Sequence, residues 1–479
     1  MSRAGSTANV SRIRFRHCAV RNGRLASLMP NSYPTPPTPT LATRDLRRVV
    51  TAAAVGNVIE WYDFYIFGSL ATILAGKFFD PTQPGADLVK WVAVFAVGFF
   101  VRPLGALLLG RIGDLIGRKY TFLITLTGIG LSTALIGVVP TYATVGVLAP
   151  VILLVLRLVQ GLCLGGEYGG AITYVAEHVP DEKRGWYTGW LQTSPTLGIV
   201  VSLAVVAGTR LALGTDRFNA WGWRIPFLVS LLLVAVAIYI RLRLQETPIF
   251  QDMKARGQTT KNPWVEAFTG PNLKFVLIAT IVVLGEGCVW YSSQFWVLYF
   301  LQTASKMNVL TSSIIVGIAL LIATPTLVGF GALSDRVGRK PIILTGFLLA
   351  AATYYPLFAL LGRVTQPGAI NYALAVLIVV VLVSYVGMVY GPIAAFLAEY
   401  FPSRIRYTSV SVPYHIGNGW GGGAVPLITT AVWTATHSLG RTLAYSIAVP
   451  AIALVLSIFL MPETRQMKIW EPSGPTAGQ

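Results

Sequence analysis

Ionisable residues lie inside several long apolar stretches of this 479-residue sequence, where a charge is costly and usually functional. Glu60 and Asp63 are three positions apart, so a helix would place both carboxylates on one face. Arg102, Arg157 and Glu286 lie in three other apolar stretches. A buried carboxylate beside a guanidinium can alternate between an ionised, paired state and a protonated, released state. Such a pair can take up and release a proton, and it can free the guanidinium to bind a carboxylate ligand.

The pairing of these charges is predicted from their depth along the expected helices. Counting about 1.5 Å of rise per residue, Glu60 and Arg102 lie at similar depth, and so do Asp63 and Arg157. The offset of the repeat described below takes Asp63 to position 285, so Glu286 lies near the same depth in the second half of the chain. We therefore predict that Glu60, Asp63 and Glu286 couple transfer of a proton to transfer of a ligand. The alternative is that these charges form salt bridges that only hold helices together.

Polar and aromatic residues near these charges complete the predicted binding site. The residues expected to contact substrate are Asn57, Tyr62, Arg102, Arg157, Gln160, Trp290 and Gln294. Trp290 and its aromatic neighbours could also hold a quaternary ammonium group by cation–π attraction. Aromatic residues at helical spacing are more often packing residues.

The elements that carry these residues are predicted to be membrane-spanning helices. Hydrophobic residues make up 54% of the chain and charged residues 12%, and about 20 apolar residues span a bilayer as a helix. The apolar runs are continuous, without the alternation of a barrel. An all-α integral membrane protein is expected, with twelve spans at residues 49–74, 89–110, 121–139, 151–176, 186–207, 226–240, 275–301, 311–331, 342–361, 372–398, 408–433 and 443–461.

A ten-residue phrase occurs twice, 221 positions apart, each time between two apolar runs. Its shared residues are Gly110, Asp114, Gly117, Arg118 and Lys119 in the first copy, and Gly331, Asp335, Gly338, Arg339 and Lys340, preceded by Arg336, in the second. Membrane proteins with internal repeats are often transporters that bind substrate between the repeats. We predict that both turns act in gating, through Asp–Arg or Asp–Lys ion pairs that break on opening.

The duplication divides the chain into two pseudo-symmetric six-helix halves. The expected parts are a disordered basic and proline-rich tail at 1–46, a first half at 47–240, a polar link at 241–272, a second half at 273–461 and a short tail at 462–479. The arginine-rich start also fits an organellar transit peptide, or translation that begins at Met29.

Basic residues gather in the loops on one side of the predicted membrane helices. By the positive-inside rule, this predicts a multi-pass protein of the cell (inner) membrane with both termini in the cytoplasm. The formal charge of +18 is then explained by topology and by anionic lipid headgroups, and no nucleic-acid partner is expected. The histidines and cysteines lack metal-ligand spacing, so we expect no metal and no cofactor. The protein is expected to act as a monomer.

No catalytic or nucleotide-binding motif is found, so an enzyme or an ATP-driven pump is not expected. The sequence resembles the metabolite:proton symporter family of the major facilitator superfamily. The similarity rests on the duplicated turn and on residues 56–64, Arg102-Pro103-Leu104-Gly105, residues 157–161, residues 165–169 and residues 221–227. One departure is Leu115, where the family turn usually has a basic residue, as at Arg336.

The resemblance implies alternating access and symport of a small organic acid or zwitterion with protons. Two arginines at depth favour an organic acid anion, such as a mono-, di- or tricarboxylate or a shikimate-like acid. A zwitterionic osmolyte such as proline or betaine is the alternative. The osmosensing relatives carry a long C-terminal coiled coil, and the residues after Glu463 show no heptads. Uniport, efflux and a non-transporting receptor also remain open.

Overall fold

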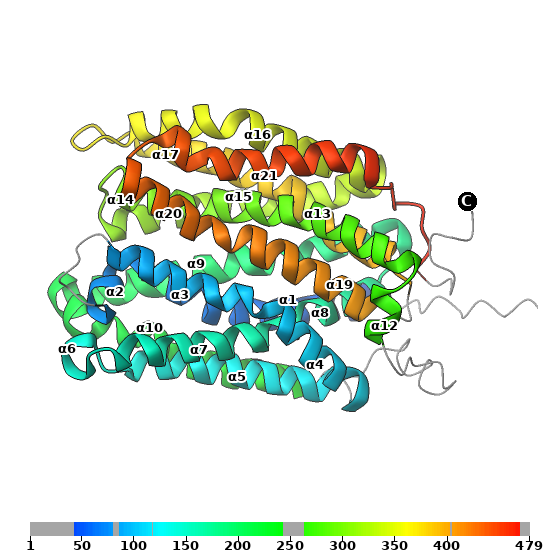
Figure 1. Cartoon of the computed structure of the whole chain (residues 1–479), viewed down its shortest axis with the longest axis horizontal. Helices are drawn as coiled ribbons and strands as arrows, with labels where there is room; N and C mark the ends of the chain where they lie inside the picture. The colour runs from blue at the N-terminus through cyan, green and yellow to red at the C-terminus, as the bar shows by residue number, and fades with distance from the viewer. Residues whose placement is uncertain (1–42, 80–85, 117, 243–262, 403–404, 470–479) are drawn as a thin grey trace, which may run out of the picture. The chain divides into compact units, whose positions relative to one another are not determined.

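The computed structural model describes residues 43–79, 86–116, 118–242, 263–402 and 405–469. Within these ranges the chain is almost entirely helical and contains no strand. Eight helices are long and apolar enough to cross a membrane, and a ninth span results if one bent helix pair is counted together. Two shorter apolar helices, and one pass that contains a glycine-rich π-helical segment, bring the number of passes to the predicted twelve. Figure 1 shows how the helices are arranged.

The first half of the fold comprises α1 to α10. Its passes are α1 (Thr43–Ser69) with α2 (Ala71–Phe78), α3 (Ala86–Phe100) with α4 (Arg102–Ile116), α5 (Arg118–Val138), α7 (Leu148–Gly165) with α8 (Tyr168–His178), α9 (Arg184–Arg217) and α10 (Arg224–Leu242). Short elements lie between them: α6 (Tyr142–Val145), a 3₁₀ turn η1 (Asp181–Lys183) and a π-helical turn η2 (Phe218–Gly222).

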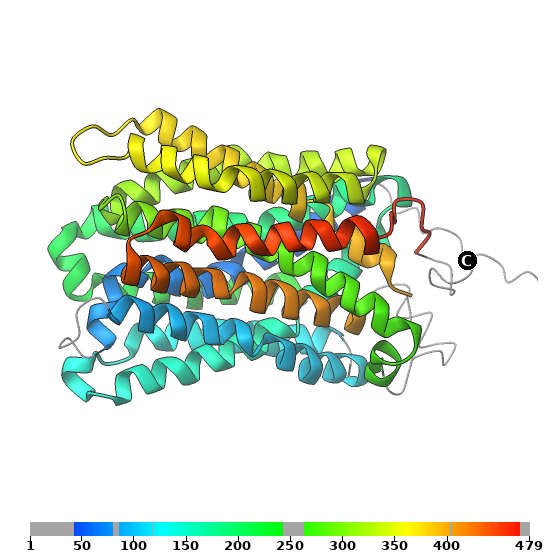
Figure 2. The same cartoon turned by 45° about the horizontal axis from the view of Figure 1, so that its top comes forward.

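The second half repeats the pattern after a short helix α12 (Pro263–Phe268). Its passes are α13 (Pro271–Tyr291) with the π-helical η3 (Ser292–Trp296) and α14 (Val297–Thr303), α15 (Val309–Val337), α16 (Arg339–Val364), α17 (Tyr372–Tyr390) with α18 (Ile393–Tyr400), α19 (Arg406–Ile416) with the π-helical η4 (Gly417–Gly422) and α20 (Ala424–Thr436), and α21 (Leu439–Leu460). Figure 2 shows the passes of both halves with their axes roughly aligned along the long dimension of the view.

Several spans that the sequence predicts as continuous helices are broken. The first span bends by 62° between α1 and α2. Gly166 and Glu167 separate α7 from α8, and Gly391 with Pro392 separates α17 from α18. Glycine and proline weaken or remove backbone hydrogen bonds of a helix, and neighbouring helices tolerate the break inside a membrane bundle. After each break, side chains near the centre of the molecule point in a different direction from the one that a continuous helix would give them.

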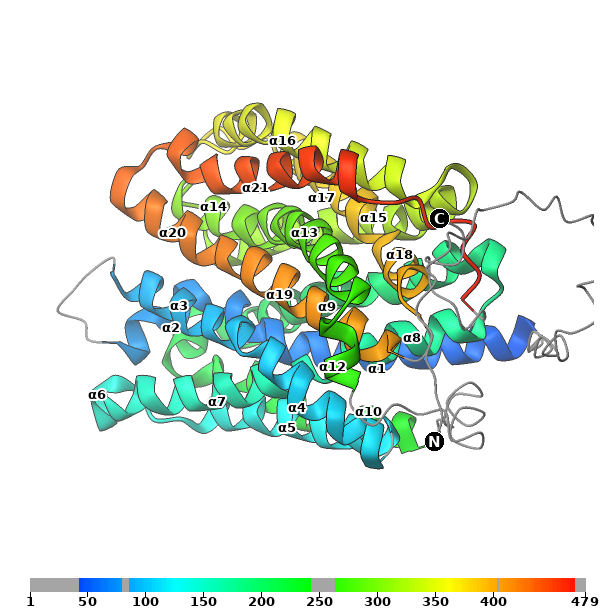
Figure 3. The same cartoon turned by 45° about the vertical axis from the view of Figure 1, so that its right-hand side comes forward.

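Glycine residues allow the two halves to touch. On α9, Gly185 packs against the carbonyl oxygen of Gly331 on α15, and Gly189 packs against Val328 of the same helix. A side chain at either glycine would meet backbone atoms of the other half. Small residues at such crossings let helix backbones approach closely. Figure 3 shows one end of these passes, where α8, α12 and α18 lie and α21 finishes. We call it the basic end, because Arg184, Arg339 and Arg406 lie there.

Parts of the predicted organisation lie outside the described residues. These are most of the N-terminal tail, residues 243–262 of the link and the residues after 469. Gly117 of the first repeated turn is outside as well, and no side chain is described for Gly110, Asp114, Arg118 or Lys119.

Candidate functional site

Arg102 is a fully buried arginine surrounded by aromatic rings at the start of α4. Its guanidinium carbon lies 4.1 Å from the ring centre of Phe99, 4.4 Å from that of Phe64 and 5.2 Å from that of Trp61. None of its three guanidinium nitrogens makes a hydrogen bond within the part of the chain that the structure describes. Arginine carries five donors, so this side chain retains its full capacity to bind an anion.

Residues of the second half also reach the Arg102 guanidinium. Tyr291 on α13 and His415 on α19 are close enough to interact with it electrostatically. The Tyr291 hydroxyl lies 3.2 Å from the hydroxyl of Tyr65 on α1, and Trp290 stacks on Tyr65 with 5.4 Å between ring centres. Arg102 therefore lies where the two halves meet, in surroundings built by both.

Glu286 on α13 is the buried carboxylate of this region in the second half. The Asn418 side chain of η4 donates to both of its oxygens, at 3.4 and 3.2 Å. Tyrosines 168, 291, 390 and 414 lie within electrostatic range of the carboxylate. The centre of the molecule thus combines the Arg102 guanidinium, the Glu286 carboxylate and many aromatic rings.

The predicted pairs Glu60–Arg102 and Asp63–Arg157 do not form. Arg102 has no hydrogen-bond partner in the described chain, and neither carboxylate oxygen of Asp63 has one there. Arg157 instead donates to the carbonyl oxygens of Phe64 and Phe95, both at 3.3 Å. Depth along a helix does not specify the direction in which a side chain points. The predicted pairs fail because the helices are rotated about their axes so that these side chains point toward other groups.

Asp63 is buried inside the first half, between helices, and does not point to Arg102. Its Oδ2 atom lies 3.1 Å from the position that a Cβ on Gly130 of α5 would occupy, beside Val234 of α10. The hydroxyl of Thr133 donates to the backbone carbonyl oxygen of Asp63 at 3.1 Å. Glu60 on the preceding turn is also buried. Asp63 is thus a carboxylate in apolar surroundings, separate from the central guanidinium.

Four predicted substrate residues have partners within the first half. Asn57 donates to Ser194 at 2.6 Å, and Tyr62 donates to the carbonyl of Pro226 at 2.5 Å. Gln160 accepts from Arg157 at 2.7 Å and donates to Thr133 at 2.7 Å. These bonds join α1, α5, α7, α9 and α10, and they hold α1, the helix that carries Asp63.

The other two predicted substrate residues lie on the second half. Trp290 is buried with its indole N–H unbonded, and Gln294 is buried with both amide atoms unbonded, within the described residues. Sequence reasoning missed other central residues, because single aromatic and amide side chains in apolar helices look like packing residues. These are Tyr65, Phe99, Tyr168, Gln192, Tyr390, Tyr414 and Asn418.

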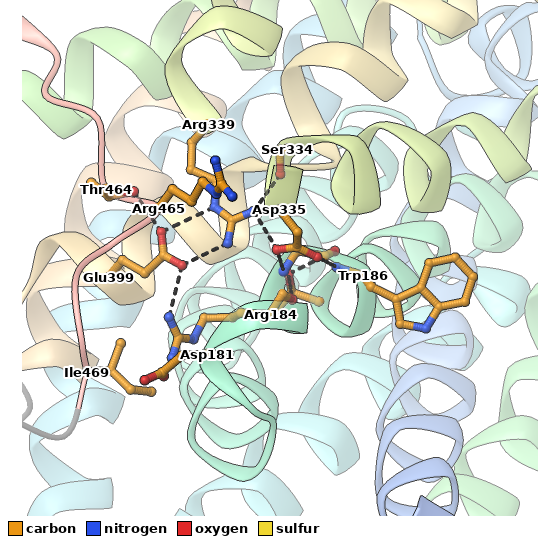
Figure 4. A network of polar contacts seen from close by, with 12 residues as sticks. Asp181, Arg184, Trp186, Ser334, Asp335, Arg339, Glu399, Thr464, Arg465 and Ile469 are labelled. Atoms are coloured by element: carbon orange, nitrogen blue, oxygen red, sulfur yellow. Dashed lines mark hydrogen bonds and ion pairs between the residues drawn. The ribbon is translucent and has the colours of Figure 1, made fainter. Parts of the chain in front are cut away.

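The second repeated turn forms the ion-pair network at the basic end that its sequence predicts (Figure 4). Arg339 Nη1 lies 2.6 Å from Asp335 Oδ1, and it donates to Ser334 at 2.7 Å. Asp335 also accepts the backbone N–H groups of Gly185 and Trp186, each at 2.8 Å. It therefore caps the start of α9, a helix of the other half, where a negative charge is favourable.

Glu399 of the second half connects this network to the first half. One of its oxygens accepts from Arg184 on α9 and from Arg339 on α16, both at 2.9 Å. Its other oxygen accepts from Thr464 at 2.7 Å. Arg184 also pairs with Asp181. A second link between the halves joins Arg406 to Glu177 at 3.1 Å.

The remaining residues of the second turn support its backbone. Gly338 has a φ of 109°, which favours glycine. The Glu463 carboxylate accepts from the backbone N–H groups of Arg339 and Lys340, at 2.9 and 3.0 Å. Lys340 also donates its ammonium to the carbonyl of Ile458 at 2.8 Å. Among the described residues, Arg336 forms no ion pair.

Several known proteins are similar to this chain in sequence or in fold. The chain is 32% identical over 433 residues to the proline/betaine transporter of Salmonella typhimurium, covering 88% of this chain and 84% of that protein. It is 31% identical over 443 residues to the inner membrane metabolite transport protein YhjE of Escherichia coli, covering 88% and 95%. The crystal structure of a D-xylose-proton symporter matches in fold, with a TM-score of 0.67 at 17% identity, over 88% of this chain and 98% of that one.

The sequence pattern of one protein family, the Major Facilitator Superfamily, matches residues 53–426 of this chain. These residues include most of the described helices. The match includes α1 to α19 and therefore both halves, the duplicated turn and the central charges. Together with twelve helical passes in two halves, it shows that this chain is a member of the Major Facilitator Superfamily of membrane transporters.

Proposed function

We propose that this protein is a proton-coupled secondary transporter of small zwitterions that carry a carboxylate, the chemical class of proline and betaine. The observation that carries the proposal is the Arg102 guanidinium, which is fully buried and makes no hydrogen bond among the described residues. A substrate carboxylate would supply the acceptors that this side chain lacks. The surrounding rings from both halves would hold the apolar and cationic parts of the substrate.

The proposal replaces the organic acid that the sequence favours with its zwitterionic alternative. Relatives at about a third identity include proteins named as proline/betaine transporters and a glycine betaine/proline/ectoine/pipecolic acid transporter of Dickeya dadantii. The two predicted arginines differ in their bonding, because Arg157 donates to Gln160 and to two carbonyl groups and leaves only its Nε unbonded, whereas none of the Arg102 nitrogens has a partner among the described residues. A single available guanidinium suits a monocarboxylate better than a di- or tricarboxylate.

We assign the coupling of proton and substrate to Asp63, with Glu60 as the neighbouring candidate. Asp63 is buried and has no hydrogen-bond partner in the described chain. An isolated charge is unfavourable there, so uptake of a proton would make its burial less costly. Asn57, Tyr62, Arg157 and Gln160 would position α1 for this step, as their bonds within the first half suggest.

Alternating access would open and close the two ends of the bundle in turn. At the basic end the halves are joined by ion pairs. At the other end they are joined by neutral hydrogen bonds, from Tyr299 to the carbonyl of Gly68 at 3.0 Å and from Thr72 to Gln302 at 2.9 Å. We propose that the basic end faces the cytoplasm of the cell, that both termini lie there, and that a monomer in contact with anionic lipid is active.

Uptake into proteoliposomes tests this proposal. Radiolabelled betaine and proline would be supplied with and without an imposed inward proton gradient, beside citrate, α-ketoglutarate and shikimate. Accumulation of betaine or proline that collapses on addition of a protonophore is the expected result. Accumulation of an organic acid alone would reject the zwitterion, and uptake that ignores the gradient would reject proton coupling.

A further inference from the structure

Glu286 has surroundings that differ from those of the proposed coupling residue Asp63. It is fully buried, and its hydrogen bonds come from the neutral amide of Asn418. No ion pair within the described residues includes Glu286. An amide balances only part of a carboxylate charge. The site therefore has an unmet preference for a cation.

Aromatic rings from both halves lie near this carboxylate. Tyr168 on α8 stacks on Tyr414 of α19, with 3.3 Å between ring centres. The hydroxyl of Tyr414 lies 3.1 Å from that of Tyr390 on α17, and all three tyrosines are in electrostatic range of Glu286. Electron-rich ring faces attract organic cations. A carboxylate among such rings is suited to a substituted ammonium group.

Arg102 and Glu286 both lie close to one short segment, η4. Its residue Asn418 bonds to Glu286, and the next residue, Gly419, packs against the other half. A Cβ on Gly419 would lie 3.0 Å from the carbonyl oxygen of Phe99 and 4.0 Å from Cδ of Arg102. Tyr291 is in electrostatic range of both charges. The two halves thus present opposite charges to the same small central region.

We infer that Glu286, together with Asn418 and the neighbouring tyrosines, binds the cationic group of the substrate while Arg102 binds its carboxylate. This inference rests on the proposed function and adds a determinant of specificity to it. Glu286 would make the transporter select zwitterions over acids of the same shape. Both groups must be bound together, so the substrate would also draw the two halves toward each other.

Glycine betaine and 3,3-dimethylbutyrate form a matched pair of probes. They have the same shape and the same carboxylate, and they differ in a quaternary nitrogen that is replaced by carbon. Binding of each to the purified full-length protein would be measured by isothermal titration calorimetry. We expect betaine to bind the wild-type protein about tenfold or more tightly than its carbon analogue.

Glu286→Gln separates the two contributions. We expect it to weaken betaine binding by about tenfold or more and to leave binding of 3,3-dimethylbutyrate unchanged or tighter. Arg102→Met should weaken both ligands. Ser292→Ala is the control on the same pass, because Ser292 bonds to Ser446 of α21, and it should change neither. Thermal unfolding of each variant reports whether it is folded.

The outcomes distinguish this inference from the function on which it rests. Equal binding of both probes by the wild-type protein would overturn the role of Glu286 and leave the carboxylate transporter intact. An equal loss of both probes in Glu286→Gln would also overturn it, since the residue would then only maintain the shape of the site. If the wild-type protein bound neither probe, the proposed function itself would be rejected.

Discussion

Arg184 at the start of α9 and Glu399 near the end of α18 form a buried ion pair between the two halves, with 2.9 Å between Nη1 and Oε1. The same oxygen is 2.9 Å from Arg339. One carboxylate therefore contacts two buried guanidinium groups from different halves, beside the pairs of Arg184 with Asp181 and of Arg339 with Asp335. Removal of one partner of a buried pair typically costs about 3–5 kcal/mol, because the remaining charge is left without compensation.

Glu399→Gln is therefore expected to shift the protein toward conformations open at the basic end. A single cysteine at Val328, which is buried against α9, would report the opening in a background without the native cysteines. The alkylation rate of this cysteine should rise several-fold, because Glu399→Gln removes a buried ion pair. Asp216→Asn, an exposed site at the other end, is the matched control. An unchanged rate in Glu399→Gln would mean that the ion pair does not hold this end closed.

Asp335 provides a second test of the same closure, because it accepts two backbone N–H groups of α9. Asp335→Ala removes these bonds and the charge near the helix start, which together contribute about 1–2 kcal/mol. Asp335→Asn keeps one acceptor oxygen. Alkylation at the Val328 reporter should therefore follow the order Ala, Asn, wild type from fastest to slowest. Equal rates for both variants would show that the charge alone matters.

The ion pair within the second turn could be predicted from sequence, whereas its partners could not. Asp335 and Arg339 are four residues apart, so local geometry brings them together. Glu399 and Arg184 come from distant elements, and only the packing of α9 on α15 places them there. The repeat Ala-Glu-x-x-Pro at residues 176–180 and 398–402 was the available signal, since its glutamates are Glu177 and Glu399.

The intramembrane charges show a different limit of sequence reasoning. Composition and spacing predicted which charges are buried and the number of helical passes. Depth along a helix gave the wrong partners, because an arginine can turn to carbonyl oxygens of neighbouring helices, as Arg157 does. Three π-helical segments and the helix breaks also change side-chain directions. The aromatic surroundings of Arg102 depend on those directions.

The two buried arginines should respond differently to substitution. Arg157→Ala removes three hydrogen bonds of a charged donor, each worth about 1.5–3 kcal/mol, and should lower the melting temperature of the first half. Arg102→Met removes no hydrogen bond seen in the described chain and retains the apolar contacts. It should leave the melting temperature close to wild type and weaken betaine binding. Thermal unfolding and titration calorimetry on the same samples measure both effects. The reverse pattern would exchange the roles of the two residues.

Asp63→Asn tests the coupling step. The substitution keeps the shape of the side chain, and it breaks no ion pair of the described residues. We expect proteoliposomes with this variant to exchange betaine at a rate within a few-fold of wild type, and to lose accumulation driven by a proton gradient. Arg157, Gln160 and the rest of the first-half network remain in place, so folding should be retained. Gradient-driven accumulation at the wild-type level would remove Asp63 from the coupling role and leave Glu60 as the candidate.

The contact between Gly331 and Gly185 allows the closure at the basic end to be tested without changing any charge. A Cβ on Gly331 would meet the carbonyl oxygen of Gly185 on the other half, and backbone atoms cannot give way as a flexible side chain can. Gly331→Ala should therefore separate α9 from α15 and speed alkylation at the Val328 reporter. Gly329→Ala, two residues earlier on the same helix, is the matched control, because nothing lies within 4 Å of the added carbon. Both variants raise the helix propensity equally. A faster reaction in Gly331→Ala alone would show that close backbone contact, and not only ion pairing, keeps this end closed, whereas equal rates in the two variants would show that the halves do not meet here.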